Sequence, residues 1–484
     1  MTNITILWMA LPFFTGFVIY LLPKLDRFLA VGIALVSTNY ALNIFLEQSS
    51  STIQLLDSFG VTLIIDELSG FFIITNAIVT LAVIFYCWSS ERTAFFYMQV
   101  VILHGSVNAT FICADFMSVY VALEVIGIAA FLLVAYPRTD RSIWVGLRYL
   151  FVSNTAMLFY LVGAVIVYKA HHSFSFAGLR GSPPEAIALI FLGLLSKGGI
   201  FVSGLWLPLT HSESQSPVSA MLSGVVVKAG VFPLVRCALM LEEIDPIVRF
   251  FGVSTALLGV GYAVFEKDTK RMLAFHTISQ LGFVLAAPVV AGFYALTHGL
   301  VKSALFLIAG ILPSRNFKEL HYKPIDNQIW VALVIASFSI SGFPLLSGFG
   351  AKVLTSKNLL PWQVVGMNIA AVGTAISFAK FIFLPHQKNE EKIKVKFGFW
   401  WAMIVLLGGL IVANAVYYEA YTLKNIIKPL VSIAIGWLAY LLIFKQLAIK
   451  FPRVVEEFDH LIGFMSFMLI LLFWIVWTQS GFSI

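Results

Sequence analysis

The sequence predicts an all-α protein that crosses a membrane many times. Of its 484 residues, 60% are hydrophobic and 11% are charged, and the mean hydropathy is +0.93. Apolar stretches of about 20 residues, the length of a membrane-spanning helix, take up nearly the whole chain. We expect sixteen such helices, centred near residues 14, 36, 78, 103, 126, 156, 195, 228, 256, 280, 302, 341, 372, 407, 438 and 469.

The connectors between these stretches are short, and none could hold a soluble domain. The longest, from about Glu47 to Asp66, starts polar and ends in the β-like segment VTLII. Lys24 is the first basic residue and follows the first stretch, so we expect no cleavable signal peptide. We expect one membrane domain, divided into N-terminal helices (1–90), a first repeat (91–240), a second repeat (247–385) and C-terminal helices (397–484).

The basic residues of the connectors indicate the orientation in the membrane. Odd-numbered connectors carry eighteen of the 31 Lys and Arg residues, even-numbered connectors carry seven, and six lie inside the apolar stretches. Cytoplasmic connectors are enriched in Lys and Arg, so the odd connectors are expected in the cytoplasm and both termini outside. The net charge of +7 therefore reflects topology, and no motif indicates nucleic-acid binding.

Seven charged residues lie inside the apolar stretches, where each charge raises the free energy of membrane insertion by about 3 kcal/mol. Such residues usually mark an ion or proton path. One is a carboxylate, Glu124, which needs a nearby cation because desolvation disfavours its charged form. We expect it within direct or one-water reach of Lys197. The seven residues are Glu124, Arg148, Lys197, Lys228, Lys302, Lys352 and Lys380.

Two of these lysines stand beside predicted helix breaks. Gly198, Gly199, Gly204 and Pro208 follow Lys197, whereas Gly342, Pro344, Gly348 and Gly350 precede Lys352. A helix can open at mid-membrane only where protein or water satisfies the freed backbone groups. Broken helices at corresponding places in two halves indicate an inverted-repeat transporter.

The parallel extends along both halves when the fourth to eighth stretches are laid against the ninth to thirteenth. Lys228 then matches Lys380, Arg148 matches His298 and Lys302, and Glu124 matches the stretch from His276 to Gln280. We expect a continuous polar row from Lys197 through Lys228 and His298 or Lys302 to Lys352. His276 and His298 would buffer protons between the lysines.

Three further segments carry a family resemblance. They read LPLTHSESQSPVSAMLSGVVVKAGVF, EKDTKRMLAFHTISQLGFVL and THGLVKSALFLIAG. Together with the second break, they resemble motifs of the proton-translocating antiporter-like family. That family comprises the L, M and N subunits of respiratory complex I and the A and D subunits of Mrp-type multisubunit sodium/proton antiporters.

The resemblance covers about residues 60 to 385 and implies fourteen core helices and two inverted five-helix repeats with broken seventh and twelfth helices; the last two predicted helices exceed this core. It implies a proton axis of Glu124, Lys197, Lys228, His298, Lys302 and Lys352. We expect His211, and from the parallel between the halves Arg148, His276 and Lys380, to support this axis. His211 and Glu213 are kept, but the acid that the family has before this histidine is Leu209 here, and the family's APTP is SQSP.

No cofactor or metal is expected. Cys87, Cys113 and Cys237 have neither CxxC pairing nor metal-ligand spacing, and no glycine-rich nucleotide motif occurs. Energy must therefore arrive as an ion gradient or through partner subunits.

Lys352 and the chain length favour an Mrp D-type subunit. Such a subunit would move protons, coupled to sodium exchange, together with the other antiporter subunits. An N- or M-type subunit of a respiratory or photosynthetic complex I is the alternative, in which the chain would be a proton-pumping subunit of the NADH/quinone oxidoreductase. A non-conducting structural subunit and a carrier for an organic solute are two further alternatives. The retained axis charges argue against the first, and the lack of a clustered aromatic and hydrogen-bonding site against the second.

Overall fold

The computed structural model of the chain describes residues 2–48, 50–56, 60–388, 396–447, 449 and 451–479. Lys392, Lys394 and Lys450, which belong to the predicted cytoplasmic charge, lie outside these ranges. Met1 and residues 480–484 of the predicted terminal regions also lie outside them.

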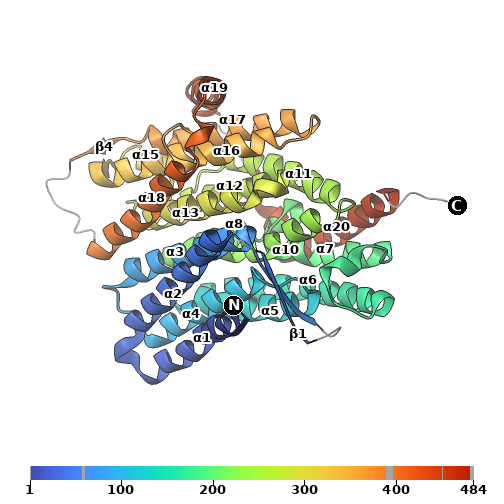
Figure 1. The fold of residues 1–484 in the computed structure, drawn as a ribbon. Helices are drawn as coiled ribbons and strands as arrows, with labels where there is room; N and C mark the ends of the chain where they lie inside the picture. The colour runs from blue at the N-terminus through green and yellow to red at the C-terminus, as the bar shows by residue number, and fades with distance from the viewer. Residues whose placement is uncertain are drawn as a thin grey trace.

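The described residues form a bundle of packed helices (Figure 1). The N-terminal elements are α1 (Thr2–Leu21), η1 (Pro23–Leu25), α2 (Asp26–Glu47), β1 (Ser51–Leu56), β2 (Gly60–Ile65), α3 (Glu67–Cys87), α4 (Ala94–Thr110), α5 (Phe116–Val134) and α6 (Asp140–His171). They are followed by η2 (Phe176–Leu179), α7 (Pro184–Gly198), η3 (Phe201–Gly204), α8 (Leu207–Glu213), α9 (Ser216–Met221), η4 (Leu222–Val226) and α10 (Val227–Met240).

The remaining elements make up the second half and the C-terminal end. The second half contains α11 (Asp245–Phe265), α12 (Thr269–Ala286), η5 (Pro288–Val290), α13 (Ala291–Ala309), α14 (Phe317–Leu320), β3 (Ile325–Asp326), α15 (Asn327–Ser341), α16 (Ser347–Lys357) and α17 (Gln363–Ile382). The C-terminal elements are β4 (His386–Gln387), α18 (Phe397–Val416), η6 (Tyr418–Ala420), α19 (Leu423–Ala439), η7 (Tyr440–Phe444), η8 (Arg453–Glu456) and α20 (Phe458–Gln479).

The predicted all-α membrane architecture is confirmed. Among the described residues, 13 helices are long and apolar enough to cross a membrane. The other three predicted stretches, near residues 103, 280 and 341, correspond to α4, α12 and the interrupted pair α15 and α16. The protein is therefore a multi-pass membrane protein.

The centre of the bundle is formed by α12 and α13, in which every residue is buried. Small residues let the neighbouring helices approach closely, as is common between membrane helices. An ideal Cβ on Gly259 of α11 would lie 2.4 Å from the backbone nitrogen of Ser279 in α12. The polar residues of α12 and α13 are thus shielded on all sides.

The predicted β-like connector is a hairpin. β1 and β2 pair antiparallel, with Ser51 opposite Ile65, and β2 also bonds to the connector between α4 and α5. Asp66 follows the hairpin and caps α3 by accepting a hydrogen bond from the Ser69 backbone, 3.0 Å away. Its carboxylate also forms an ion pair with Arg236 of α10.

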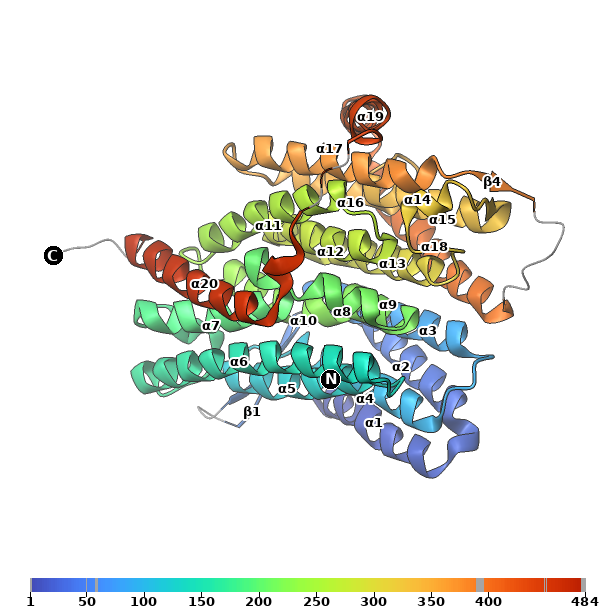
Figure 2. The ribbon, with the colours of Figure 1, turned by 180° about the vertical axis from the view of Figure 1, so that it is seen from behind.

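The C-terminal helices contact two different parts of the bundle. α19 packs on α17, where Gly436 lies against Ala375. Figure 1 and Figure 2 both show α19 nearly end-on and α17 from the side. α19 therefore crosses α17 at a steep angle. Figure 2 shows the following segment running across the bundle to α20, which packs on α7 and η3. We call the described part of residues 445–457 the strap.

Candidate functional site

The first predicted helix break is confirmed at the end of α7. Gly199 has a left-handed backbone, with φ of +70°, and an ideal Cβ there would lie 2.3 Å from a Leu207 methyl carbon. The break frees backbone groups that need partners. The carbonyl of Ser196 accepts a hydrogen bond from the Trp206 indole at 2.9 Å. The interruption is therefore a stable part of the fold.

Lys197 lies one residue before the end of this half-helix and is buried. Its ammonium donates a hydrogen bond to Oγ of Ser153 on α6, 2.5 Å away. An ideal Cβ on Gly127 of α5 would stand only 3.0 Å from the same nitrogen. The lysine head group is thus enclosed by α5, α6 and α7.

Glu124 lies one helical turn before Gly127 on α5 and is within electrostatic range of Lys197. A direct ion pair is not formed, since no contact of 4.0 Å or less joins the two groups among the described residues. Lys197 hydrogen-bonds to Ser153 instead, and one carboxylate oxygen of Glu124 is buried without a partner. The predicted reach, direct or through one water, is therefore not direct, and the one-water geometry stays a prediction.

Lys228 is fully buried near the start of α10, directly after the π-helical turn η4. Its ammonium donates to the carbonyl of Gly224 and, at 3.4 Å, to that of Ser223. A π-turn leaves carbonyls out of the regular helical pattern, and such turns frequently occur at functional sites. The ammonium of Lys228 supplies the donor that these carbonyls lack.

His298 and Lys302 lie one turn apart on α13, so their side chains share one face of the helix. Lys302 donates to the carbonyl of Leu273 on α12. Among the described residues, neither ring nitrogen of His298 has a hydrogen-bonding partner. Lys228 and Lys302 both lie within electrostatic range of His298, so its imidazole lies near two amines.

His276 of α12 continues this arrangement toward the second half. Its ring packs on Phe378 of α17 with the ring centres 4.8 Å apart, and both ring nitrogens are buried without a partner in the described part of the chain. Lys302, Lys352 and Lys380 all lie within electrostatic range of it. The two histidines are thus interleaved with the lysines.

The second predicted break is confirmed between α15 and α16. Gly342 has φ of +85°, and an ideal Cβ on Gly348 would lie 1.8 Å from the carbonyl oxygen of Ser339. Lys352, on the second half-helix, donates a hydrogen bond to the carbonyl of Ser341 at 3.0 Å. The lysine itself therefore satisfies one group that the break frees.

A small cavity joins Lys352 to His298. Its volume is about 10 Å³, enough for one water molecule. Gln280, Tyr294, Thr297 and Ser339 contribute polar groups to its wall. A water bound there would have several hydrogen-bonding partners, so the step from His298 to Lys352 is polar.

The structure thus brings Lys228, His298, Lys302, His276 and Lys352 together in the interior. Lys197 is linked to this group through backbone packing, because an ideal Cβ on Gly230 of α10 would lie 2.3 Å from the nitrogen of Gly198. The carboxylate nearest to the row is that of Glu124, at its beginning, so positive charge dominates the interior.

The supporting residues have different surroundings. Arg148 of α6 donates to the carbonyl of Glu456 in the strap. Lys380 of α17 donates to the carbonyls of Ala263 and Glu266, at 3.2 and 2.9 Å. His211 of α8 is buried against Phe306, with ring centres 5.4 Å apart. Arg148 and Lys380 therefore bind backbone at the ends of other elements and do not occupy the row.

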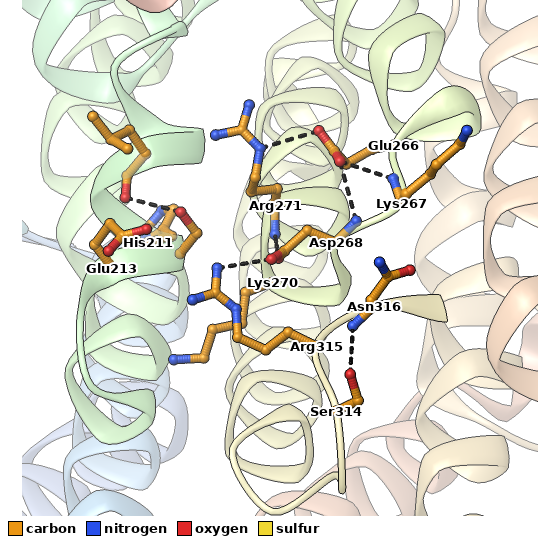
Figure 3. A network of polar contacts seen from close by, with 12 residues as sticks. His211, Glu213, Glu266, Lys267, Asp268, Lys270, Arg271, Ser314, Arg315 and Asn316 are labelled. Carbon is orange, nitrogen blue, oxygen red and sulfur yellow. Dashed lines mark hydrogen bonds and ion pairs between the residues drawn. The ribbon is translucent and has the colours of Figure 1, made fainter. Parts of the chain in front are cut away.

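A network of charged groups covers one end of the bundle beside His211 (Figure 3). Glu266 pairs with Arg271 at 3.1 Å, Asp268 pairs with Arg315 at 2.8 Å, and Lys270 donates to the Ser214 carbonyl at 2.8 Å. Burial alone would raise the pKa of Glu266, but the Arg271 charge and two backbone N–H donors hold it below the usual value. This carboxylate is therefore ionised and fixed in place.

Several polar residues escaped the sequence analysis. Ser153 and Ser341 hydrogen-bond to axis lysines, and Tyr149 has a buried hydroxyl within electrostatic range of Glu124. Serine is frequent where membrane helices pack and tyrosine at the membrane interfaces, so no pattern in the sequence singles these residues out. Among the described residues, no group of three or more His, Cys, Asp or Glu side chains could hold a metal ion.

A second polar cluster lies among the N-terminal helices. Ser37 of α2 meets the ring of His104 at 2.8 Å and accepts from Asn108 at 3.2 Å, while Asn76 donates to Asn108 at 2.8 Å. Its members bond to one another, which is typical of a cluster that fixes helix packing.

Comparison with known proteins identifies a family and a similar curated protein. Residues 113–377 match the family described as NADH:quinone oxidoreductase/Mrp antiporter, TM. A similar curated protein is the D subunit of the Na(+)/H(+) antiporter of Alkalihalophilus pseudofirmus, 28% identical over 82% of this chain and 90% of its own.

Two solved structures share the fold. A chain of the membrane-bound sulfane sulfur reductase, an archaeal respiratory membrane complex, has a TM-score of 0.75 at 22% identity, over 90% of this chain and 99% of its own. A chain of the Mrp complex from a Dietzia species has a TM-score of 0.72 at 18% identity, over 96% of this chain and all of its own (100%).

Proposed function

Because the chain belongs to the NADH:quinone oxidoreductase/Mrp antiporter transmembrane family, we propose that it is the proton-translocating D-type subunit of a multisubunit cation/proton antiporter. It is an antiporter-like membrane subunit, homologous to the D subunits of Na(+)/H(+) antiporters. The observation that carries the proposal is the basic row that runs between two helix breaks, from buried Lys197 to half-buried Lys352.

The row suits proton transfer because imidazoles lie among its amines. Neutral imidazole can accept a proton on one nitrogen and release one from the other. Neighbouring lysines in a dry interior cannot all be charged, because like charges disfavour one another's charged form. Protonation of Lys228 therefore favours release from Lys302, so a proton advances by alternate occupancy.

Glu124 and Lys197 form the start of the path in this proposal. A carboxylate within electrostatic range stabilises the protonated Lys197, and Ser153 orients its ammonium. Lys352 forms the far end, beyond the water-sized cavity. Arg148 and Lys380 would support the path from its margins, and His211 would connect it to the charged network of Figure 3.

We further propose sodium as the exchanged cation, a bacterial cell membrane as the location, and both termini on the outer side. The chain would fold as two repeats, residues 91–240 and 247–385, since each of these ranges contains one broken helix with an adjacent lysine. Its partners would be the remaining subunits of the antiporter.

An N- or M-type subunit of complex I remains the second candidate, because the matching family covers both assemblies. The neighbouring genes distinguish them: small membrane subunits of the Mrp type favour the antiporter, whereas quinone-site and flavoprotein subunits favour complex I. A non-conducting structural subunit is the third candidate.

The decisive experiment expresses the complete neighbouring gene set in a host lacking its own antiporters. Everted vesicles should then show sodium-dependent proton movement, measured with a pH-sensitive dye. Lys228→Ala should abolish it at equal protein abundance, whereas Lys24→Ala, at an exposed position outside the row, should not. Full activity of Lys228→Ala would exclude the proposed path.

A further inference from the structure

A second, larger cavity begins at Lys352 on the side opposite the row. It has a volume of about 810 Å³ and lies between α16, α17 and the first half of α19. Four lysines line it: Lys352, Lys357, Lys424 and Lys428. Among the described residues of its wall, none is acidic. Most of the remaining surface is apolar, including Phe283, Val353 and Met367.

No described residue that lines this cavity carries a negative charge to balance the four lysines. Four ammonium groups around one cavity repel one another unless water or an anion lies between them. Lys428 is held beside the cavity by a hydrogen bond to Oγ of Ser356, 2.8 Å away. The cavity wall therefore combines several lysines, one of them held by Ser356, with a largely apolar surface.

The combination of an apolar groove and a cationic rim matches an amphiphilic anion. The volume falls in the usual range of ligand sites, about 300 to 1,000 Å³. Basic pockets between membrane helices bind anionic lipid head groups. α19 also forms one wall while leaving much of its own surface exposed, so a lipid could enter sideways from the bilayer.

We propose that this cavity binds an anionic phospholipid, with its phosphate among Lys357, Lys424 and Lys428 and an acyl chain along the apolar wall. The lipid supplies the negative charge that the cavity lacks and covers the mouth next to Lys352. Binding is measured independently of transport, so the proposal stands or falls without the proposed function.

The test uses the full-length chain in nanodiscs and a fluorescent phosphatidylglycerol as the probe, with phosphatidylcholine as the neutral reference. The triple variant Lys357→Gln, Lys424→Gln, Lys428→Gln should weaken phosphatidylglycerol binding at least about tenfold and leave phosphatidylcholine unchanged. The matched control is Lys24→Gln, Lys318→Gln, Lys388→Gln, which removes the same charge from exposed positions elsewhere and should retain binding.

A second variant tests the apolar wall without altering charge. Ala371→Phe places a larger side chain in the cavity and should also weaken phosphatidylglycerol binding, while glycerol phosphate at equal concentration should not compete for the wild-type site. Equal losses in the control and the lysine triple variant would overturn the proposal. Efficient competition by glycerol phosphate would also overturn it and would indicate a site for free anions. Undiminished lipid selectivity in both test variants would overturn it as well and would leave the cavity to a protein partner.

Discussion

The ammonium of Lys352 donates a hydrogen bond to the carbonyl oxygen of Ser341, 3.0 Å away, at the last residue of α15. One hydrogen bond therefore joins the last residue of the polar row to the end of a broken helix. Lys352→Met should lower exchange at least about tenfold and cost about 1 kcal/mol of stability from the lost hydrogen bond. Everted-vesicle assays and thermal unfolding measure the two effects, and Lys318→Met is the control at an exposed site. Unchanged exchange in Lys352→Met would contradict its role.

Glu124→Ala should abolish exchange while protein abundance stays the same, because the variant removes the carboxylate that stabilises the protonated Lys197. Ser153→Ala should have a smaller effect, since it removes only the hydroxyl that orients the same ammonium. Initial exchange rates in everted vesicles, normalised to protein abundance from immunoblots, show which variant loses more activity. Wild-type rates from Glu124→Ala would refute the proposed start of the path.

Asp66→Asn should destabilise the protein by about 3 kcal/mol, because it leaves Arg236 buried without its ionic partner. Burial tends to raise the pKa of Asp66, but the hydrogen bonds and charge of Arg236 hold it below the usual value. The ion pair therefore stabilises the fold above the unfolded-state pKa, about 3.9, and this stability is lost as the pH falls through the folded-state pKa.

Thermal unfolding in detergent between about pH 3 and pH 7 measures this contribution. The wild type should lose more stability than Asp66→Asn on acidification. Parallel curves for the two proteins would show that the pair contributes nothing that depends on protonation.

Glu456→Gln should have the opposite pH dependence. Burial raises the pKa of the Glu456 carboxyl, and Arg271 only partly offsets this effect. A raised pKa favours the fold below the unfolded-state value, about 4.3, and this contribution is lost as the pH rises through the folded-state pKa. The wild type should therefore lose more stability than Glu456→Gln between about pH 4 and pH 8, as followed by thermal unfolding. An unchanged slope in the variant would contradict this assignment.

The purified chain reconstituted alone should show no sodium/proton exchange in liposomes, whereas the co-expressed neighbouring set should. The row offers a path for protons, and the proposal assigns the coupling to a second ion to the other subunits of the antiporter. Dye-based proton flux with and without a sodium gradient measures the difference. Robust sodium-dependent flux from the single chain would identify it as a self-sufficient carrier.

The sequence predicted the features that depend on local chemistry. Glycines at Gly199 and Gly342 located both breaks, because few other residues adopt a left-handed backbone there. Lysines within apolar stretches identified the buried row. The sequence predicted Glu124 within direct or one-water reach of Lys197, but it could not show that Ser153 of α6 takes the Lys197 hydrogen bond.

Features that depend on packing between distant segments could not be predicted. The turn η4 lies where Lys228 bonds back to Gly224 and where α13 packs closely on η4, since an ideal Cβ on Gly224 would be 2.3 Å from Oγ of Ser303. Likewise, apolarity alone indicated that α19 and α20 were membrane helices, but not that they pack on α17 and α7.

The position of the strap constrains how the two halves can move. α19 is attached to the second half through α17, α20 is attached to the first half through α7, and Glu456 pairs with Arg271 between them. A rocking motion of one half against the other, as in many secondary transporters, would have to pull this tether from its anchoring arginine. In the proposed function, proton conduction would therefore proceed by rotation of side chains and exchange of water, with little relative movement of the two halves.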